Sequence, residues 1–389
     1  MVNYDLLLAV IFYGLVMLFF YIKRKNVEVQ AKIFFLYRTK LGLRAMDKIA
    51  KLFPKSLHFL GYVGIILGFI GMFGLLFWLI YQTVLLFVKP ETPAALAPVL
   101  PGVKIPGLPV LPFWYFIISI FVVAAFHEFF HGVYARLYNI YVKSSGFAFI
   151  GPIPAAFVEP DEKQTAKKSK NKQMAIFAAG PFANIVLFGV VFLLTIFLIN
   201  PFLGSLFESK GIQVYDLEDT FPFSNANISR GEVILSIDGI KINDTVEFVD
   251  FMKNTKPRQE LLVETDKQVV SVKTVKHPKG EGHGYVGVVI APAEVGLKEE
   301  TVDRYGNALP WVFLWFGRLF LWVYILSLGI GLFNLLPLGP IDGGRMFYTA
   351  CLWFFKDEKK AKSLWFKISI LCLFIIIVQL LAFTFQFFS

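Results

Sequence analysis

The chain has 389 residues, of which 56% are hydrophobic, and its mean hydropathy is +0.63. A water-soluble protein of this length could not bury so much apolar surface, so the composition excludes an ordinary soluble globule and indicates a polytopic membrane protein. The formal net charge of +10 does not indicate a nucleic-acid partner, because the basic residues are not gathered in a soluble domain.

Six apolar segments are long enough to cross a bilayer, which requires roughly 20 helical residues. In chain order they cover residues 2–22, 57–88, 111–138, 174–199, 309–336 and 368–388. No small-residue cleavage site follows the first segment, so we expect it to be a retained membrane anchor.

Basic residues gather in three of the segments between these spans, at 23–55, 163–172 and 356–367. The first of them carries ten Lys and Arg against two acids. The positive-inside rule places all three in the cytoplasm, and alternating spans then place residues 200–308 outside. The sequence therefore predicts a multi-pass protein of the cell membrane with a long extracytoplasmic insertion.

Two regions differ from plain membrane helices. Residues 144–160 are apolar but are interrupted by Gly146, Gly151, Pro152 and Pro154, so we expect an extended segment that dips into the membrane beside the third span. Residues 201–292 contain short β-like runs at 211–215, 232–237, 261–264, 269–274 and 285–290, and a helical pattern at 245–252. These runs predict a compact α+β domain inserted between two spans.

The third span contains His127-Glu128-Phe-Phe-His131. On a helix, residues four apart lie on one face, so two imidazoles can reach one metal ion while the intervening glutamate handles a proton. Ionisable residues in hydrocarbon are costly unless they have partners, so a functional site is the first interpretation. The alternative is a polar cluster that joins helices, or a structural zinc site.

A catalytic zinc site normally has three protein ligands and one open position. The best candidate for the third ligand is Asp342, which follows a stretch broken by Pro337, Gly339 and Pro340 in the fifth span. Irregular backbone at membrane depth is tolerated only where it is buried in protein or lines a cavity. The predicted topology puts Asp342 at a depth similar to that of the histidines. The alternative role for Asp342 is to cap the helix that follows.

The two separated motifs, HExxH and the Asn334-x-x-Pro337-x-x-x-x-Asp342-Gly pattern, resemble the signature of the site-2 protease family of intramembrane zinc metalloproteases. The first spans are similar to those of archaeal-type members. The Gly-Pro-x-x-Asn pattern that ends at Asn184 also resembles a family element. We expect its glycine and proline to be helix-packing and helix-start residues, and Asn184 to form a hydrogen bond between helices. Residues 231–239 resemble the core of a PDZ domain.

The resemblance implies a Zn²⁺ ion held by His127, His131 and Asp342, with Glu128 as general base. It implies Asn334 as a polar helper near the cleaved bond, although an asparagine there can also bridge helices. It further implies that residues 144–160 hold the substrate as an extended strand. The expected partners are single-span membrane-protein substrates and the lipid bilayer.

The expected fold is an all-α polytopic membrane protein with about six transmembrane helices, a membrane-associated β-loop and an inserted α+β PDZ-like domain. We expect an N-terminal anchor and basic loop at residues 1–56 and a first membrane part at residues 57–200. An extracytoplasmic PDZ-like domain is expected at residues 201–308, and a second membrane part at residues 309–389. The expected active site lies toward the cytoplasmic side, and the expected function is intramembrane cleavage of transmembrane helices.

Two other function classes remain. A metal or ion transporter would be expected to show internal repeats and several broken helices, and the sequence shows one broken region and no repeat. A catalytically inactive, membrane-anchored PDZ binding protein would be favoured by the loss of a motif residue, and none is lost.

Overall fold

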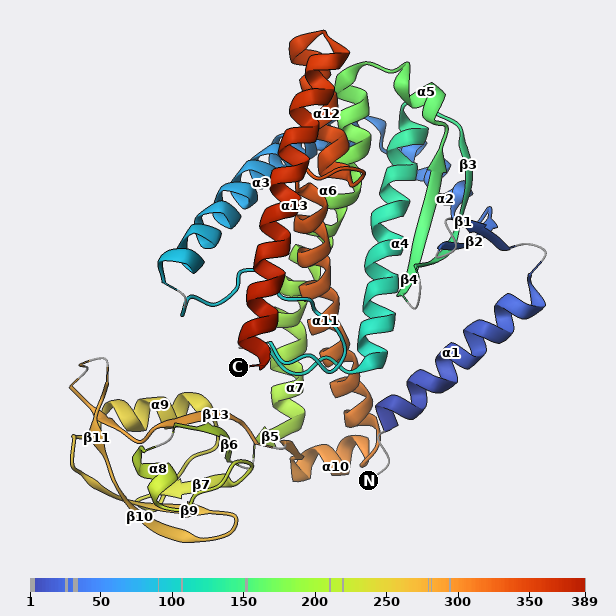
Figure 1. Cartoon of the computed structure of the whole chain (residues 1–389). Coiled ribbons are helices and arrows are strands. Elements are labelled where there is room, and N and C mark those ends of the chain that lie inside the picture. Colours follow the sequence, from blue (N-terminus) through green and yellow to red (C-terminus); the bar gives the residue numbers. More distant parts are fainter. Residues whose placement is uncertain are drawn as a thin grey trace. The chain divides into compact units, whose positions relative to one another are not determined.

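The computed structural model describes residues 4–24, 27–30, 34–89, 91–105, 108–150, 153–209, 211–218, 220–278, 280, 282–293 and 295–388. The chain divides into two compact units (Figure 1). The membrane unit comprises Met1–Thr195 and Arg318–Ser389, and the inserted unit comprises Ile196–Gly317.

Six helices in the described residues are long and apolar enough to cross a membrane, which confirms the expected number. They are α1 (Tyr4–Ile22), α3 (Pro54–Val88), α4 (Phe113–Leu137), α6 (Lys170–Leu194), α11 (Leu309–Leu335) and α13 (Glu358–Phe388). A π-helical turn (Thr195–Ile199) joins α6 to α7 (Asn200–Leu206). Three short helices accompany them: α2 (Leu43–Leu52), α5 (Glu162–Ala166) and α12 (Asp342–Phe355).

The ends of the long helices follow from local chemistry. Pro54 lies in the first turn of α3, where its missing N–H has no helical partner to lose. At the start of α4, the N–H of Phe113 donates to the carboxylate of Asp5 in α1, at 2.8 Å from Oδ2. Pro181 was expected to start a helix, and that expectation is wrong: α6 begins at Lys170, so Pro181 lies inside it. A proline there removes one backbone hydrogen bond in the middle of the helix.

The membrane unit also contains a four-stranded antiparallel sheet in the order β1-β2-β3-β4. Its strands are β1 (Val27–Gln30), β2 (Phe34–Thr39), β3 (Val142–Ile150) and β4 (Ile153–Pro160). The predicted β-loop forms the β3–β4 hairpin; Gly151 and Pro152, which were assigned to it, lie outside the described residues. The sequence did not predict that β1 and β2, from the first basic loop, would extend this hairpin.

The sheet has one interior position that only glycine can occupy. Gly146 of β3 lies opposite Arg38 of β2, and a Cβ at Gly146 would collide with the carbonyl oxygen of Tyr37. The glycine that interrupts the apolar run in the sequence therefore allows the two hairpins to pair. β4 forms an edge of the sheet and packs against α4 (Figure 1).

The inserted unit is an α+β domain around a sheet in the order β10-β9-β7-β6-β13, with β8 paired to β7. Besides α7 and the start of α11, its helices are α8 (Pro222–Asn225), α9 (Thr245–Lys253) and α10 (Glu299–Tyr305). Its strands are β5 (Phe207–Ser209), β6 (Ile212–Leu217), β7 (Val233–Ile237), β8 (Ile240–Lys241), β9 (Glu260–Thr265), β10 (Val269–Lys273), β11 (Val275–Lys276), β12 (Gly284–Tyr285), β13 (Val288–Pro292) and β14 (Val295–Leu297). Alternate strand residues fill a single core, which includes Ile212, Ile234, Leu261 and Val263.

One predicted strand, at residues 285–290, is wrong. The chain forms two strands there, because Gly287 between them has a φ of 72°, which a regular strand cannot include. β12 pairs with β11, and β13 pairs with β6. The other predicted β-like runs correspond to β6, β7, β9 and β10, and the predicted helix corresponds to α9.

Candidate metal centre

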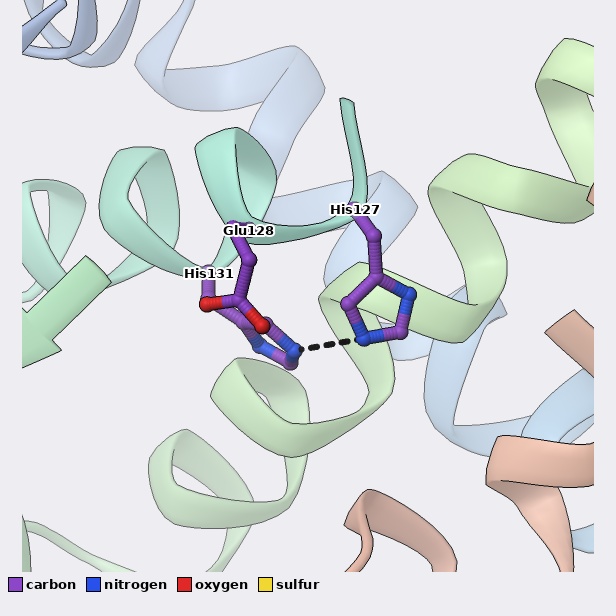
Figure 2. A group of neighbouring side chains, drawn as sticks. All are labelled: His127, Glu128 and His131. Carbon is purple, nitrogen blue, oxygen red and sulfur yellow. Dashed lines mark hydrogen bonds between the residues drawn. The ribbon is translucent and has the colours of Figure 1, made fainter. Parts of the chain in front are cut away.

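The two histidines of the HExxH motif lie one turn apart on the same face of α4. His127 and His131 are 6% and 8% exposed, and their Nε2 atoms are 3.1 Å apart (Figure 2). This spacing follows from the helical repeat, which stacks residues i and i+4. The two imidazoles thus present one nitrogen each to a common point inside the protein.

Asp342, the expected third ligand, lies beside both imidazoles. Its Oδ2 atom is 2.9 Å from His127 Nε2 and 3.2 Å from His131 Nε2. The backbone break between the end of α11 and the start of α12 delivers this carboxylate on the first residue of α12. The capping alternative is not observed, because the N-cap residue of α12 is Ile341 and no side chain caps it.

The two glycines that follow Asp342 make this approach possible. A Cβ at Gly343 would collide with the backbone of Leu335, and one at Gly344 with the backbone of Leu338. The first turn of α12 therefore packs directly on the segment that ends α11. Larger residues at either position would push the carboxylate away from α4.

α6 holds both imidazoles from the opposite side. The Nδ1–H of His131 donates to the carbonyl oxygen of Ile176, at 2.7 Å. The side-chain amide of Asn184 lies 3.1 Å from Nδ1 of His127. Between these two contacts, Gly180 passes so close to the rings that a Cβ there would collide with the Nε2 atoms of both histidines.

Glu128 lies on the same helix turn and faces the same space (Figure 2). Its carboxylate oxygen and the ring nitrogens of His127 and His131 all lie within 4.8 Å of one another, so distance alone would allow it as a ligand. However, Asp342 approaches both rings more closely, and Oε2 of Glu128 already accepts a hydrogen bond from the backbone N–H of Val158, at 3.1 Å. These contacts favour Asp342 as the third ligand and leave Glu128 beside it.

Asn334 is not joined to this group. Its side-chain Nδ2 donates to the carbonyl oxygen of Ile330, one turn earlier in α11, at 3.0 Å. Among the described residues, no hydrogen bond links Asn334 to the histidines, Glu128 or Asp342. The predicted role of Asn334 would require its side chain to change partners.

The donor set fits a zinc ion. Ligands about 2.0–2.1 Å from a tetrahedral zinc lie roughly 3.3–3.4 Å from each other. The three atoms contributed by His127, His131 and Asp342 are separated by 2.9, 3.1 and 3.2 Å, close to that spacing. Imidazole nitrogens and a carboxylate oxygen are also the atoms that zinc prefers. The Nδ1–H of His131 donates to a backbone carbonyl oxygen, as in known zinc sites.

Comparison with known proteins places the chain in a family. The sequence profile of peptidase family M50 matches residues 115–376. An uncharacterized protein of Methanocaldococcus jannaschii is 30% identical over 324 residues, which cover 82% of this chain and 78% of that protein. The zinc metalloprotease RasP of Geobacillus kaustophilus is 24% identical over 270 residues, which cover 57% of this chain and 61% of that protein.

Among solved structures, the PDZ domain of an SdrC-like protein from Listeria monocytogenes matches 21% of this chain and 88% of its own length, with 20% identity and a TM-score of 0.20. The profile match spans every residue of the candidate metal centre. The chain therefore belongs to peptidase family M50, the site-2 protease family of membrane metallopeptidases, whose two separated motifs it carries.

Proposed function

We propose that this protein is a zinc endopeptidase that cleaves the transmembrane helices of single-span membrane proteins within the bilayer. The convergence of three donor atoms, from His127, His131 and Asp342, carries the proposal. The carboxylate of Glu128 beside them supplies the group that proton transfer needs. The zinc metalloprotease among its relatives supports the choice of metal.

In this proposal His127, His131 and Asp342 hold the zinc ion. A bound zinc ion would lower the pKa of a water molecule and polarise the carbonyl of the scissile bond. Glu128 accepts the proton of the attacking water and returns it to the leaving amine nitrogen. The Val158 N–H donates to Oε2 of Glu128 and so helps to hold this carboxylate in place beside the metal ligands.

The edge of β4 is the proposed site for the substrate backbone. A peptide bond inside a helix is shielded by its i→i−4 hydrogen bonds, so cleavage requires local unwinding. The Val158 N–H points away from β3 toward Glu128, and in a strand the residue two positions earlier, Ala156, points the same way. Unpaired backbone groups on this edge would replace the bonds that an unwound substrate loses.

Asn334 would assist at the carbonyl oxygen of the scissile bond. Its amide is a hydrogen-bond donor and could stabilise the negative charge that develops on that oxygen. For this role the amide has to leave the carbonyl of Ile330, to which it now donates. We propose that a bound substrate provides the stronger acceptor.

The proposed topology has the metal centre toward the cytoplasm and the inserted unit outside. Its basis is the excess of Lys and Arg in the three short loops described above. The inserted unit would then bind or exclude the exterior part of a substrate and take no part in the chemistry.

The decisive experiment is to incubate purified, zinc-loaded protein with a set of single-span helices and to map the fragments by mass spectrometry. New termini inside the hydrophobic span, absent when the metal is removed by a chelator, support the proposal. A transporter would instead move zinc into sealed vesicles without producing fragments. An inactive binding protein would retain a substrate without either activity.

A further inference from the structure

We infer that Ser369 of α13 is a positioning residue for the proposed zinc ligand Asp342, because its hydroxyl holds the backbone break that presents this carboxylate to the histidines. The inference rests on the proposed zinc site. It makes metal binding depend on the last span of the chain, which contributes no ligand. Ser369 acts through the position of Asp342 and not as a fourth ligand.

The break between α11 and α12 needs partners for its backbone. It covers residues 336–341, and its two prolines, Pro337 and Pro340, have no N–H with which to continue a helical ladder. Between them, Gly339 has a φ of 35°, outside the helical range. Irregular backbone at membrane depth is tolerated only where other parts of the protein satisfy its polar groups. The groups that hold this break therefore have to come from a neighbouring element.

Ser369 supplies two hydrogen bonds to the break from a single hydroxyl. The N–H of Gly339 donates to Ser369 Oγ at 3.0 Å, and this hydroxyl donates to the carbonyl oxygen of Pro337 at 3.2 Å. The direction of both bonds is fixed, because a backbone N–H can only donate and a carbonyl oxygen can only accept. Ser369 is 8% exposed, so little water competes for these bonds. One side chain thus ties together the residues on either side of Leu338.

The rest of the contact between α13 and the break is apolar. One buried cluster contains side chains of both segments: Ile368, Cys372, Ile375 and Ile376 of α13, and Leu336, Leu338 and Ile341 of the break. Apolar packing is not directional, whereas a hydrogen bond weakens steeply when its angle changes. The hydroxyl of Ser369 is therefore the group in this contact that fixes where the break lies along α13.

The position of the break is passed directly to Asp342. A Cβ at Gly344 would collide with the carbonyl oxygens of Leu338 and Gly339, so the first turn of α12 rests on the backbone that Ser369 holds. Asp342 begins that turn, and its Oδ2 lies 2.9 and 3.2 Å from the two imidazole Nε2 atoms. Ligand distances in a metal site vary by only about 0.2 Å, so a small shift of the break weakens metal binding.

The test compares zinc affinity, measured by competition with a chelator, for the full-length wild type, Ser369→Ala, Ser369→Thr and Thr83→Val. Ser369→Ala removes both hydrogen bonds and should weaken zinc binding about tenfold, the lower end of what losing a group behind the ligands costs. Ser369→Thr keeps the hydroxyl and should stay within about threefold of wild type.

Thr83→Val is the matched control. Thr83 is buried, and its hydroxyl accepts a hydrogen bond from Nε2 of Gln379 in α13 at 3.0 Å. The variant therefore removes a buried hydroxyl that contacts the same helix without touching the break, and it should leave zinc affinity within about twofold. The Co²⁺ form adds a readout that a general loss of packing does not move, because its ligand-field spectrum depends on the donor geometry. The spectrum should change in Ser369→Ala, and it should keep its wild-type form in Ser369→Thr and Thr83→Val.

Wild-type zinc affinity or an unchanged Co²⁺ spectrum in Ser369→Ala would overturn the inference. An equal loss of affinity in Ser369→Thr or in Thr83→Val would overturn it too, since the hydroxyl at residue 369 would then not be the cause. If Ser369→Ala fails to fold, Ser369→Cys decides: its thiol is a weak donor and acceptor, so we expect at least about a threefold loss, and wild-type affinity would contradict the role. A wild type that binds no zinc would instead reject the proposed metal site itself.

Discussion

The carboxylate of Glu128 accepts a hydrogen bond from the backbone N–H of Val158, with 3.1 Å between Oε2 and the nitrogen. This contact joins the metal-site helix α4 to β4, the edge strand of the membrane-unit sheet. A segment that pairs with β4 next to Val158 would lie directly beside the proposed base. The hydrogen bond between Glu128 and Val158 therefore connects the proposed site of substrate unwinding to the proposed site of proton transfer.

A substitution at Gly180 tests whether metal binding requires the close contact between α6 and the two imidazole rings. Gly180→Ala introduces a Cβ that collides with the Nε2 atoms of both histidines, so it should lower zinc affinity at least about tenfold. The matched control is Gly189→Ala on the same helix, where a Cβ meets nothing within 4 Å. Chelator competition on both variants gives the measurement. Equal affinities would show that the rings do not hold the positions described.

Ala156 tests whether substrates pair with β4. Ala156→Pro removes an N–H that points away from the sheet, so it should reduce cleavage of helical substrates several-fold more than cleavage of an unfolded peptide. Ala156→Val keeps the N–H and serves as the control. A proline in β4 tests substrate pairing better than a proline in β3. Because β3 is an interior strand, a proline at residues 147–150 would break the sheet itself. Equal losses on both substrates would argue against strand pairing.

The inserted unit is predicted to select substrates and not to act on the scissile bond. β5 and β14 pair with each other, from Phe207↔Leu297 to Ser209↔Val295, and so bring the two ends of the domain together. Replacing residues 211–293 by a short flexible linker should leave zinc binding and cleavage of a minimal helix intact. It should also raise the cleavage rate of substrates with large exterior domains. A deletion that keeps its zinc but cleaves neither substrate would make the domain part of the catalytic machinery.

The sequence predicted what depends on local pattern. The six spans follow from hydropathy. Asp238 and Gly239 form the turn between β7 and β8. The turn residues adopt φ values of 49° and 75°, as this dipeptide favours.

Among contacts between segments far apart in the chain, the two motifs indicated the approach of Asp342 to His127 and His131, but the sequence could not predict the others. Nothing local in β2 indicates that Phe35 lies opposite Phe149, because that pairing depends on where α3 and α4 place the intervening chain. The contacts of Val158 with Glu128 and of Asn184 with His127 are equally distant in sequence. For Asn184 a partial signal existed: its position four residues after Gly180 puts both on one face of α6.

The most direct test of the central claim measures zinc content and cleavage together in three proteins. Wild type should hold about one zinc ion per chain and cut a single-span helix within its hydrophobic segment. Glu128→Gln should keep the zinc but cleave at least about a hundredfold more slowly, because the amide cannot accept the proton. Asp342→Ala should lose most of the zinc and the cleavage, whereas Asp303→Ala, which removes an exposed carboxylate of the inserted unit, should change neither. Wild-type cleavage by Glu128→Gln, or full zinc content in Asp342→Ala, would contradict the account.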